Sequence, residues 1–202
     1  MTPSTNSKKM PYRLELLPTA EGAKYYKDMP QTRDTGNAGV DLYVCVPYSA
    51  SYVTTAQLLD LGCSARLVRL GSDGGEEDCH YWLCPRSSIY KSGVMMTNSQ
   101  GVIDKTYRGT LKAPVTLVSR EALGDQTFEG IRLFQIVAPD MGDIVEVRIV
   151  ESLSETARGS GGFGSTGTSG DAGERPEQPA GERPEQQSLA DLLVSGVNVT
   201  TL

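Results

Sequence analysis

Short strand-like runs, rich in Val, Ile, Leu and Tyr, recur along most of the chain and limit what it can fold into. PYRLEL (11–16) and AGVDLYVCV (38–46) are followed by similar runs between residues 80 and 119, then by IRLFQIVAP (131–139) and IVEVRIVES (144–152). Turn-forming residues separate these runs at intervals of roughly ten residues, a spacing typical of β-sandwiches and barrels. We therefore predict one all-β domain over residues 11–155, preceded by a flexible N-terminus at 1–10.

Three stretches between these runs are less regular. Residues 19–37 show no periodic pattern, and AQLLDLG (56–62) fits either a helical turn or two short strands. GSDGGEEDC (71–79) has the composition of a surface loop.

The net charge of −6 is unevenly distributed. Residues 168–202 hold six acidic residues and two arginines, so neither part of the chain is basic enough to suggest direct nucleic-acid binding. The N-terminus has no apolar signal sequence, and no segment is long enough to span a membrane, so we expect a soluble intracellular protein of the cytoplasm or nucleus.

The four cysteines, Cys45, Cys63, Cys79 and Cys84, contain no C-x-x-C pair and are predicted to be free thiols. His80, the only histidine, lies between Cys79 and Cys84. A zinc site there would need a fourth ligand, and the spacing offers none.

A change of composition marks the C-terminal region. GERPEQ occurs at 173–178 and again at 181–186, without core-forming residues. We predict a disordered acidic tail over 168–202, in which SLADLLVSGV (188–197) could form a short amphipathic helix that docks on a protein partner.

A glycine-rich segment, residues 156–167, separates the two regions. Gly159, Gly161 and Gly164 have G-x-G-x-x-G spacing, but no helix-forming sequence follows, which excludes a dinucleotide-binding turn. The composition also suits a plain linker. Arg158 and Phe163 argue against a linker, because a guanidinium and an aromatic ring favour an arm that closes over a phosphate ligand.

Five separated segments are dense in residues that handle phosphate, metal and water: AGVDLY, PRSS, NSQGVIDKTYRG, RLFQIV and ARGSGGFGSTG. In this order and spacing they resemble the five motifs of the trimeric all-β deoxyuridine triphosphate nucleotidohydrolases (dUTPases). The resemblance covers about residues 11–167 and implies a distorted jelly-roll, or β-clip, barrel. It also implies hydrolysis of dUTP to dUMP and pyrophosphate, which keeps uracil out of DNA and supplies dUMP for dTMP synthesis.

The segment GVIDKTY supplies the predicted catalytic base. Asp104 follows apolar residues at the end of a strand, where a carboxylate can be held towards a water molecule, and the matching aspartate of the family activates the attacking water. Tyr107 would pack under the deoxyribose, where a ribose hydroxyl would not fit. An ordinary turn aspartate and a core tyrosine are the alternatives.

Base recognition is assigned by the resemblance to Asn98 and to the backbone around Gly101, Val102 and Ile103. Backbone groups can specify uracil, because a wrong base would leave buried polar groups unpaired. Lys112 completes the predicted substrate-binding set of this region.

Phosphate binding is assigned to Arg86, Ser87 and Ser88. The family usually has glycine where this chain has Ser88, which raises the question of whether the turn keeps its geometry. Gln135 would hold the nucleophilic water or a phosphate oxygen, or serve as a buried structural amide. Asp41 would help to place Mg²⁺ through metal-bound water, or simply fix its turn.

The glycine-rich segment resembles the mobile lid of the family. Arg158 would bind the γ-phosphate and Phe163 would stack on the uracil ring, while Gly164, Ser165 and Thr166 would cover the triphosphate. The resemblance further implies a homotrimer whose active sites are shared between subunits.

Two other functions compete with this one. A dCTP deaminase, which resembles dUTPases in fold, needs a glutamate ten positions after Asp104, where this chain has Pro114. A non-catalytic binding module with the same fold is the second alternative, and Thr106 and Ser88 leave room for it because both depart from the usual motifs.

Overall fold

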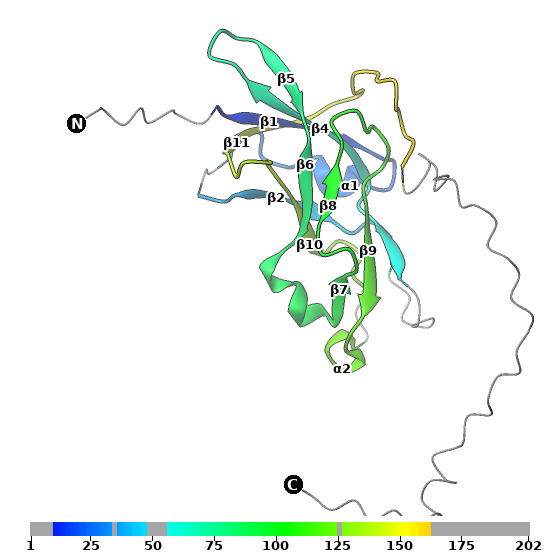
Figure 1. Cartoon of the computed structure of the whole chain (residues 1–202). Coiled ribbons are helices and arrows are strands. Elements are labelled where there is room, and N and C mark those ends of the chain that lie inside the picture. Colours follow the sequence, from blue (N-terminus) through cyan, green and yellow to red (C-terminus); the bar gives the residue numbers. More distant parts are fainter. Residues whose placement is uncertain (1–9, 34–35, 48–55, 125–126, 163–202) are drawn as a thin grey trace, which may run out of the picture. The chain divides into compact units, whose positions relative to one another are not determined.

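The computed structural model of the chain describes residues 10–33, 36–47, 56–124 and 127–162. In these residues eleven strands form three sheets, joined by turns and very short helices (Figure 1). The prediction of an all-β domain is confirmed. None of the described helices is long and apolar enough to cross a membrane.

The first sheet has the strand order β11-β1-β4-β5. Its strands are β1 (Tyr12–Pro18), β4 (Cys63–Leu70), β5 (Glu76–Cys79) and β11 (Ile144–Ile149). β1 runs parallel to β11 and antiparallel to β4. Both faces of β1 are buried: Leu14 and Leu16 point into the apolar core, and the charged Arg13 and Glu15 lie on the other face.

The other two sheets carry the motif segments. The second sheet, of order β2-β10-β6-β8, contains β2 (Gly39–Tyr43), β10 (Arg132–Val137), β6 (Tyr81–Pro85) and β8 (Gly101–Ile103). The third, of order β3-β9-β7, contains β3 (Gln57–Asp60), β9 (Lys112–Leu117) and β7 (Val94–Met96). The helical elements are α1 (Ala23–Tyr26), the 3-10 helix η1 (Ser87–Ser92) and α2 (Arg120–Leu123).

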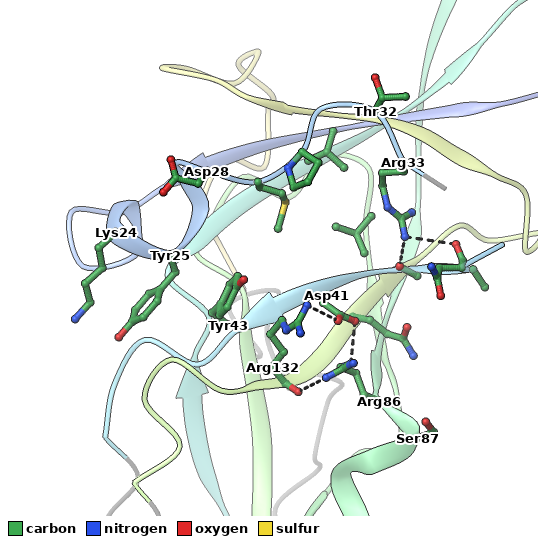
Figure 2. A pocket seen from close by; sticks show the side chains of 18 residues that line it. Lys24, Tyr25, Asp28, Thr32, Arg33, Asp41, Tyr43, Arg86, Ser87 and Arg132 are labelled. Atoms are coloured by element: carbon green, nitrogen blue, oxygen red, sulfur yellow. Dashed lines mark hydrogen bonds and ion pairs between the residues drawn. The ribbon is translucent and has the colours of Figure 1, made fainter. Parts of the chain in front are cut away.

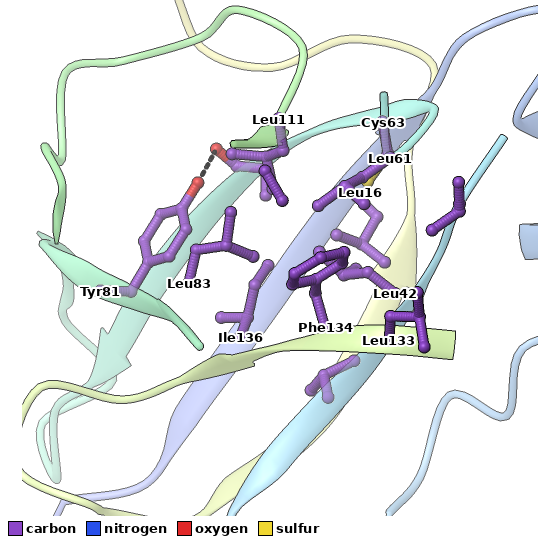
Figure 3. Packing of buried hydrophobic residues seen from close by; sticks show 14 of the residues in the cluster. Leu16, Leu42, Leu61, Cys63, Tyr81, Leu83, Leu111, Leu133, Phe134 and Ile136 are labelled. Carbon is purple, nitrogen blue, oxygen red and sulfur yellow. Dashed lines mark hydrogen bonds between the residues drawn. The ribbon is translucent and has the colours of Figure 1, made fainter. Parts of the chain in front are cut away.

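The apolar core is assembled from residues of different sheets (Figure 3). Leu16, Leu42, Leu83 and Phe134 come from four different strands and are almost fully buried. The buried Tyr81 hydroxyl donates to the Ala65 carbonyl at 3.3 Å, which satisfies a polar group inside the core. This packing fixes the strands from which the site residues project.

Two irregular stretches are resolved into strands. AQLLDLG contains β3 and is followed directly by β4, so the strand alternative is correct. The prediction of a loop over 71–79 is wrong for its second half, since residues 76–79 form β5. Arg69 on β4 pairs with Glu77 at 3.1 Å and Arg66 pairs with Asp78 at 2.6 Å, and such cross-strand ion pairs favour a strand despite its acidic composition.

Candidate active site

A pocket of about 800 Å³ collects several predicted site residues beside the second sheet (Figure 2). Asp41 on β2 lies opposite Gln135 on β10, and Gln135 lies opposite Cys84 on β6, two residues before Arg86. Asp41, Gln135, Arg86 and Ser87 all line the pocket. Antiparallel pairing of three strands therefore brings together three motifs that are far apart in the sequence.

Asp41 is held by two guanidinium groups. Its Oδ1 lies 2.9 Å from Arg86 Nε, and its Oδ2 lies 3.3 Å from Arg132 Nη1. Arg86 also donates to the Arg132 carbonyl at 2.8 Å. These contacts fix both arginines at the pocket wall while leaving further N–H donors on each group.

The pocket carries more cations than anions on its wall. Its charged lining residues are Lys24, Asp28, Arg33, Asp41, Arg86 and Arg132. Arg33 donates to the Gly39 carbonyl at 2.5 Å and so joins its own loop to β2. Four cations against two carboxylates make the pocket suited to an anionic ligand such as a polyphosphate.

Gly39 provides the space that Gln135 occupies. A Cβ at Gly39 would lie 2.2 Å from Gln135 Oε1, so any other residue there would displace the amide. Gln135 Nε2 is 3.4 Å from the Pro85 carbonyl, and the residue is partly exposed to the pocket. The amide can therefore be reached from the pocket.

The predicted phosphate-binding residues Arg86, Ser87 and Ser88 follow β6 and lead into η1. Ser87 is exposed and Ser88 partly exposed at the start of this 3-10 helix. Ser88 is not among the residues with positive φ, so serine adopts this turn without strain. The departure from the usual glycine therefore does not distort the segment.

Asp104 belongs to a second cluster. It follows β8, and its Oδ2 forms an ion pair with Arg158 from the glycine-rich segment. Its Oδ1 lies 3.4 Å from His80 Nδ1, which also accepts the Lys105 N–H at 3.3 Å. The Asp104 side chain is 44% exposed, so water can reach the carboxylate.

Tyr107 packs between glycines beside this carboxylate. Its hydroxyl donates to the Thr110 carbonyl at 3.0 Å, and the Arg158 guanidinium lies 5.7 Å from its ring centre. A Cβ on Gly109 or Gly162 would come within 2.5 Å or 2.8 Å of Tyr107 atoms. Burial raises the pKa of the Tyr107 hydroxyl, with the Arg158 charge opposing, so it stays protonated at neutral pH.

The predicted base-binding hairpin is open to solvent. Asn98 is exposed in the turn between β7 and β8, where Ser99 has φ of 61°. Val102 is 64% exposed, which is high for an apolar residue beside a candidate site. Lys112, at the start of β9, pairs with Asp60 at 3.9 Å.

The sequence did not assign a role to two arginines that the structure places at the clusters. Arg132 lies in the quoted segment RLFQIV, but only its ion pair with Asp41 shows its role. Arg108 follows Tyr107, and its side chain donates to carbonyls of the turn after Asp104. The only sequence feature that could have pointed to these two arginines is that both lie inside the quoted motif segments.

The two clusters are distinct within one chain. The residues that line the pocket around Asp41 do not include Asp104, Tyr107 or Arg158. Phe163, Gly164, Ser165 and Thr166 lie outside the described residues, as does the predicted tail.

Within the described residues, no group of three or more His, Cys, Asp or Glu side chains could hold a metal ion. All four cysteines are described and are free thiols, as predicted. Burial raises the pKa of Cys45 to about 11 and of Cys63 to about 12, so both stay protonated at neutral pH.

The fold and the site define an all-β protein with an arginine-rich pocket beside its second sheet. Residues 25–167 match the dUTPase family. The deoxyuridine 5'-triphosphate nucleotidohydrolase of Rhizobium rhizogenes is 34% identical over 143 residues, which cover 68% of this chain and 83% of that protein. The enzyme of the same name from a Picosynechococcus species is 32% identical over 137 residues, covering 67% and 88% of the two chains.

Among solved structures, a dUTPase mutant of Staphylococcus bacteriophage 80alpha with dUpNHpp is similar at a TM-score of 0.43 and 18% identity, covering 76% of this chain and 98% of that one. The family match and the bacterial relatives identify the protein: the chain belongs to the dUTPase family.

Proposed function

We propose that the protein hydrolyses dUTP to dUMP and pyrophosphate. The observation that carries the proposal is the match to the family over residues 25–167, which includes every residue of the pocket around Asp41 except Lys24, and all of the Asp104 cluster. Relatives that cover most of the same segment are named deoxyuridine 5'-triphosphate nucleotidohydrolases.

The pocket around Asp41 would bind the triphosphate. Arg86 supplies a fixed cation, Ser87 and Ser88 add hydroxyl groups, and Gln135 faces the same space. Arg132 would add a second cation beside Arg86. The predicted contribution of each group is to fix the phosphate chain for in-line attack.

Mg²⁺ fits this pocket through Asp41. Both oxygens of Asp41 already pair with arginines, so a water-mediated contact disturbs the site less than direct coordination. A single carboxylate suits an ion that takes most of its ligands from phosphate oxygens and water. When bound, the ion would neutralise charge on the triphosphate.

Asp104 would act as the general base. Its carboxylate takes a proton from a water molecule as that water forms a bond to the α-phosphorus, and the bond from the α-phosphorus to the bridging oxygen breaks to release pyrophosphate. In the structure, Arg158 forms an ion pair with one oxygen of this carboxylate. A γ-phosphate would offer Arg158 a more highly charged partner, which would free Asp104 for the reaction.

The remaining predicted residues would select the base and sugar. Asn98 with the backbone of Gly101, Val102 and Ile103 would bind uracil, and Tyr107 would pack against the deoxyribose. Lys112 completes this set. Closure of the segment that carries Arg158, Phe163, Gly164, Ser165 and Thr166 would cover the nucleotide.

We further propose a homotrimer with shared sites. In one chain the phosphate pocket and the Asp104 cluster are distinct, although one reaction needs both. A closed threefold arrangement would let each pocket receive Asp104 from a neighbouring subunit. In this proposal the chain binds dUTP and two further copies of itself. A protein that binds the C-terminal tail is a separate proposal.

A nucleotide panel tests the function. With Mg²⁺ present, dUTP should give dUMP and pyrophosphate, while dTTP, dCTP and UTP should react far more slowly. Release of ammonia from dCTP would indicate a deaminase, which Pro114 on β9 argues against. Binding of dUTP without any product would instead support a non-catalytic module.

A further inference from the structure

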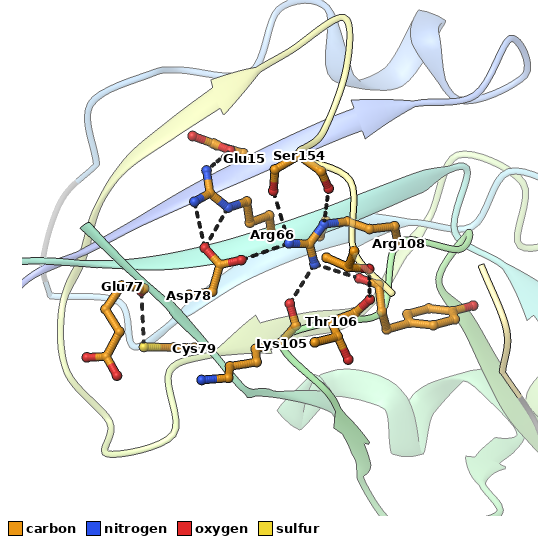
Figure 4. Close-up of polar contacts among 12 residues, drawn as sticks. Glu15, Arg66, Glu77, Asp78, Cys79, Lys105, Thr106, Arg108 and Ser154 are labelled. Atoms are coloured by element: carbon orange, nitrogen blue, oxygen red, sulfur yellow. Dashed lines mark hydrogen bonds and ion pairs between the residues drawn. The ribbon is translucent and has the colours of Figure 1, made fainter. Parts of the chain in front are cut away.

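Asp78 lies on β5, in the acidic stretch that the proposed mechanism does not use. Its Oδ1 accepts from Arg66 Nε at 2.8 Å, and its Oδ2 accepts from Arg108 Nη2 at 2.8 Å (Figure 4). Both carboxylate oxygens are therefore engaged by guanidinium groups from different elements. Charge-assisted contacts of this length hold the two arginines in fixed positions.

Arg108 transmits this contact to the turn that follows Asp104. Its Nη1 donates to the Lys105 carbonyl at 2.6 Å and to the Tyr107 carbonyl at 3.0 Å. The turn itself is closed by the Tyr107 N–H, which donates to the Asp104 carbonyl at 2.9 Å. With its side chain only 9% exposed, Arg108 is in effect a buried connection between β5 and this turn.

The same arginine also holds the segment that leads to Arg158. Arg108 Nε donates to the Ser154 carbonyl at 3.0 Å, and its backbone N–H donates to the Gly159 carbonyl at 2.8 Å. Arg108 thus holds two backbone segments in place, one that bears Asp104 and one that bears Arg158.

The other side of Asp78 is anchored in the first sheet. Arg66 Nη1 lies 3.1 Å from Glu15 Oε2, and Arg13 lies 3.0 Å from Glu15 Oε1 and 2.7 Å from Glu76. Charges of alternating sign therefore run from β1 to Arg108. Partial burial acts to raise the pKa of Asp78, but Arg66 and then Arg108 outweigh it, so the pKa lies below its ordinary value and Asp78 is ionised at neutral pH.

We infer that Asp78 is a positioning residue for the proposed general base: through Arg108 it fixes the turn that holds Asp104 and Tyr107. The expected effect on catalysis rests on the proposed function. The effect on the turn can be measured separately, by hydrogen exchange. It also assigns a role to β5 that its loop-like sequence did not suggest.

The test compares Asp78→Asn with Glu77→Gln. Glu77 is the adjacent residue of β5, 62% exposed and paired with Arg69, so Glu77→Gln removes a charge from the same strand without touching Arg108. We expect Asp78→Asn to lower kcat for dUTP by about tenfold or more with little change in KM, because small displacements of a catalytic group are costly. The control should keep the wild-type kcat.

Hydrogen exchange of the Tyr107 amide is the second readout. Exchange should become faster in Asp78→Asn and stay unchanged in Glu77→Gln. Only Asp78→Asn weakens the carboxylate contact that holds Arg108 in place against the turn. If Asp78→Asn proves poorly folded, Asp78→Glu, which keeps the charge but moves the carboxylate, is subjected to the same two measurements with the same expectation.

Unchanged Tyr107 exchange in a folded Asp78 variant would overturn the inference, and so would accelerated exchange with wild-type kcat. If the wild-type protein itself did not hydrolyse dUTP, the proposed function would fail, and the exchange experiment would still decide whether Asp78 holds the turn.

Discussion

At the scale of single residues, Asp104 has two different neighbours on its two oxygens. Arg158 pairs with Oδ2, and His80 approaches Oδ1. Arg158 is thus engaged by Asp104, and in the proposed reaction a phosphate group would have to compete with this carboxylate for the guanidinium.

Asp104→Asn tests the assignment of the base. The amide keeps the shape of the side chain but cannot accept the proton of water, so kcat should fall by at least about a hundredfold. The Kd for dUTP, measured by titration calorimetry with the inactive variant, should change little. Glu151→Gln, at an exposed position, is the matched control and should retain full activity. A near-normal kcat in Asp104→Asn would remove Asp104 from this role.

The roles of individual arginines show where sequence reasoning ends. Asp104, Asp41 and Arg86 could be selected because they lie in quoted motifs with a chemistry of their own. Arg108 and Arg132 lie in the same motifs, but their roles depend on Asp78 and Asp41, which lie 30 and 91 positions away and meet them only in the folded chain. Ion pairs between distant strands leave no periodic signal in a sequence.

At the scale of elements, the strands with alternating sequence were predicted and β5 was not. Alternation reports which face of a strand is buried, so it identifies strands such as β9, where the buried Ala113 and Val115 alternate with partly exposed residues. β5 has three acidic residues in a row and borders only β4. Its stability comes from arginines on β1, β4 and the turn after β8, which no local pattern contains.

The end of η1 depends on a glycine that can be tested. Gly93 has φ of 75°, and a Cβ there would lie 2.3 Å from the Ser119 carbonyl oxygen. Gly74 also has positive φ, at 82°, but apart from its chain neighbours no atom of the described residues lies within 4 Å of its Cβ position. The two glycines therefore separate backbone strain from steric conflict.

Gly74→Ala should lower the free energy of unfolding by roughly 1–2 kcal/mol, the cost of an alanine with positive φ. Gly93→Ala should cost about 1–3 kcal/mol more, because the added methyl group must displace backbone atoms. Urea denaturation of both variants measures the difference. Equal losses would show that the neighbourhood of Gly93 relaxes freely.

At the scale of the whole molecule, the separation of the two clusters bears on the assembly. In the proposed reaction, Arg86 and Gln135 of the pocket around Asp41 would bind phosphate, and Asp104 of the other cluster would take the proton. In a trimer with shared sites, a chain damaged in one cluster still contributes the intact other cluster to a neighbour. This property can be measured without a structure of the complex.

Mixing two inactive variants is the test of shared sites. Arg86→Ala should disable the phosphate pocket and Asp104→Asn the base, so each homotrimer alone should be nearly inactive. After subunit exchange at equal amounts, about a quarter of the sites should combine an intact pocket with an intact base, which predicts about a quarter of the wild-type specific activity. Light scattering should give three times the chain mass throughout. If the mixture stays as inactive as its components although exchange is complete, each site is built within one chain. In that case the pocket around Asp41 and the Asp104 cluster of one chain would have to move together during the reaction.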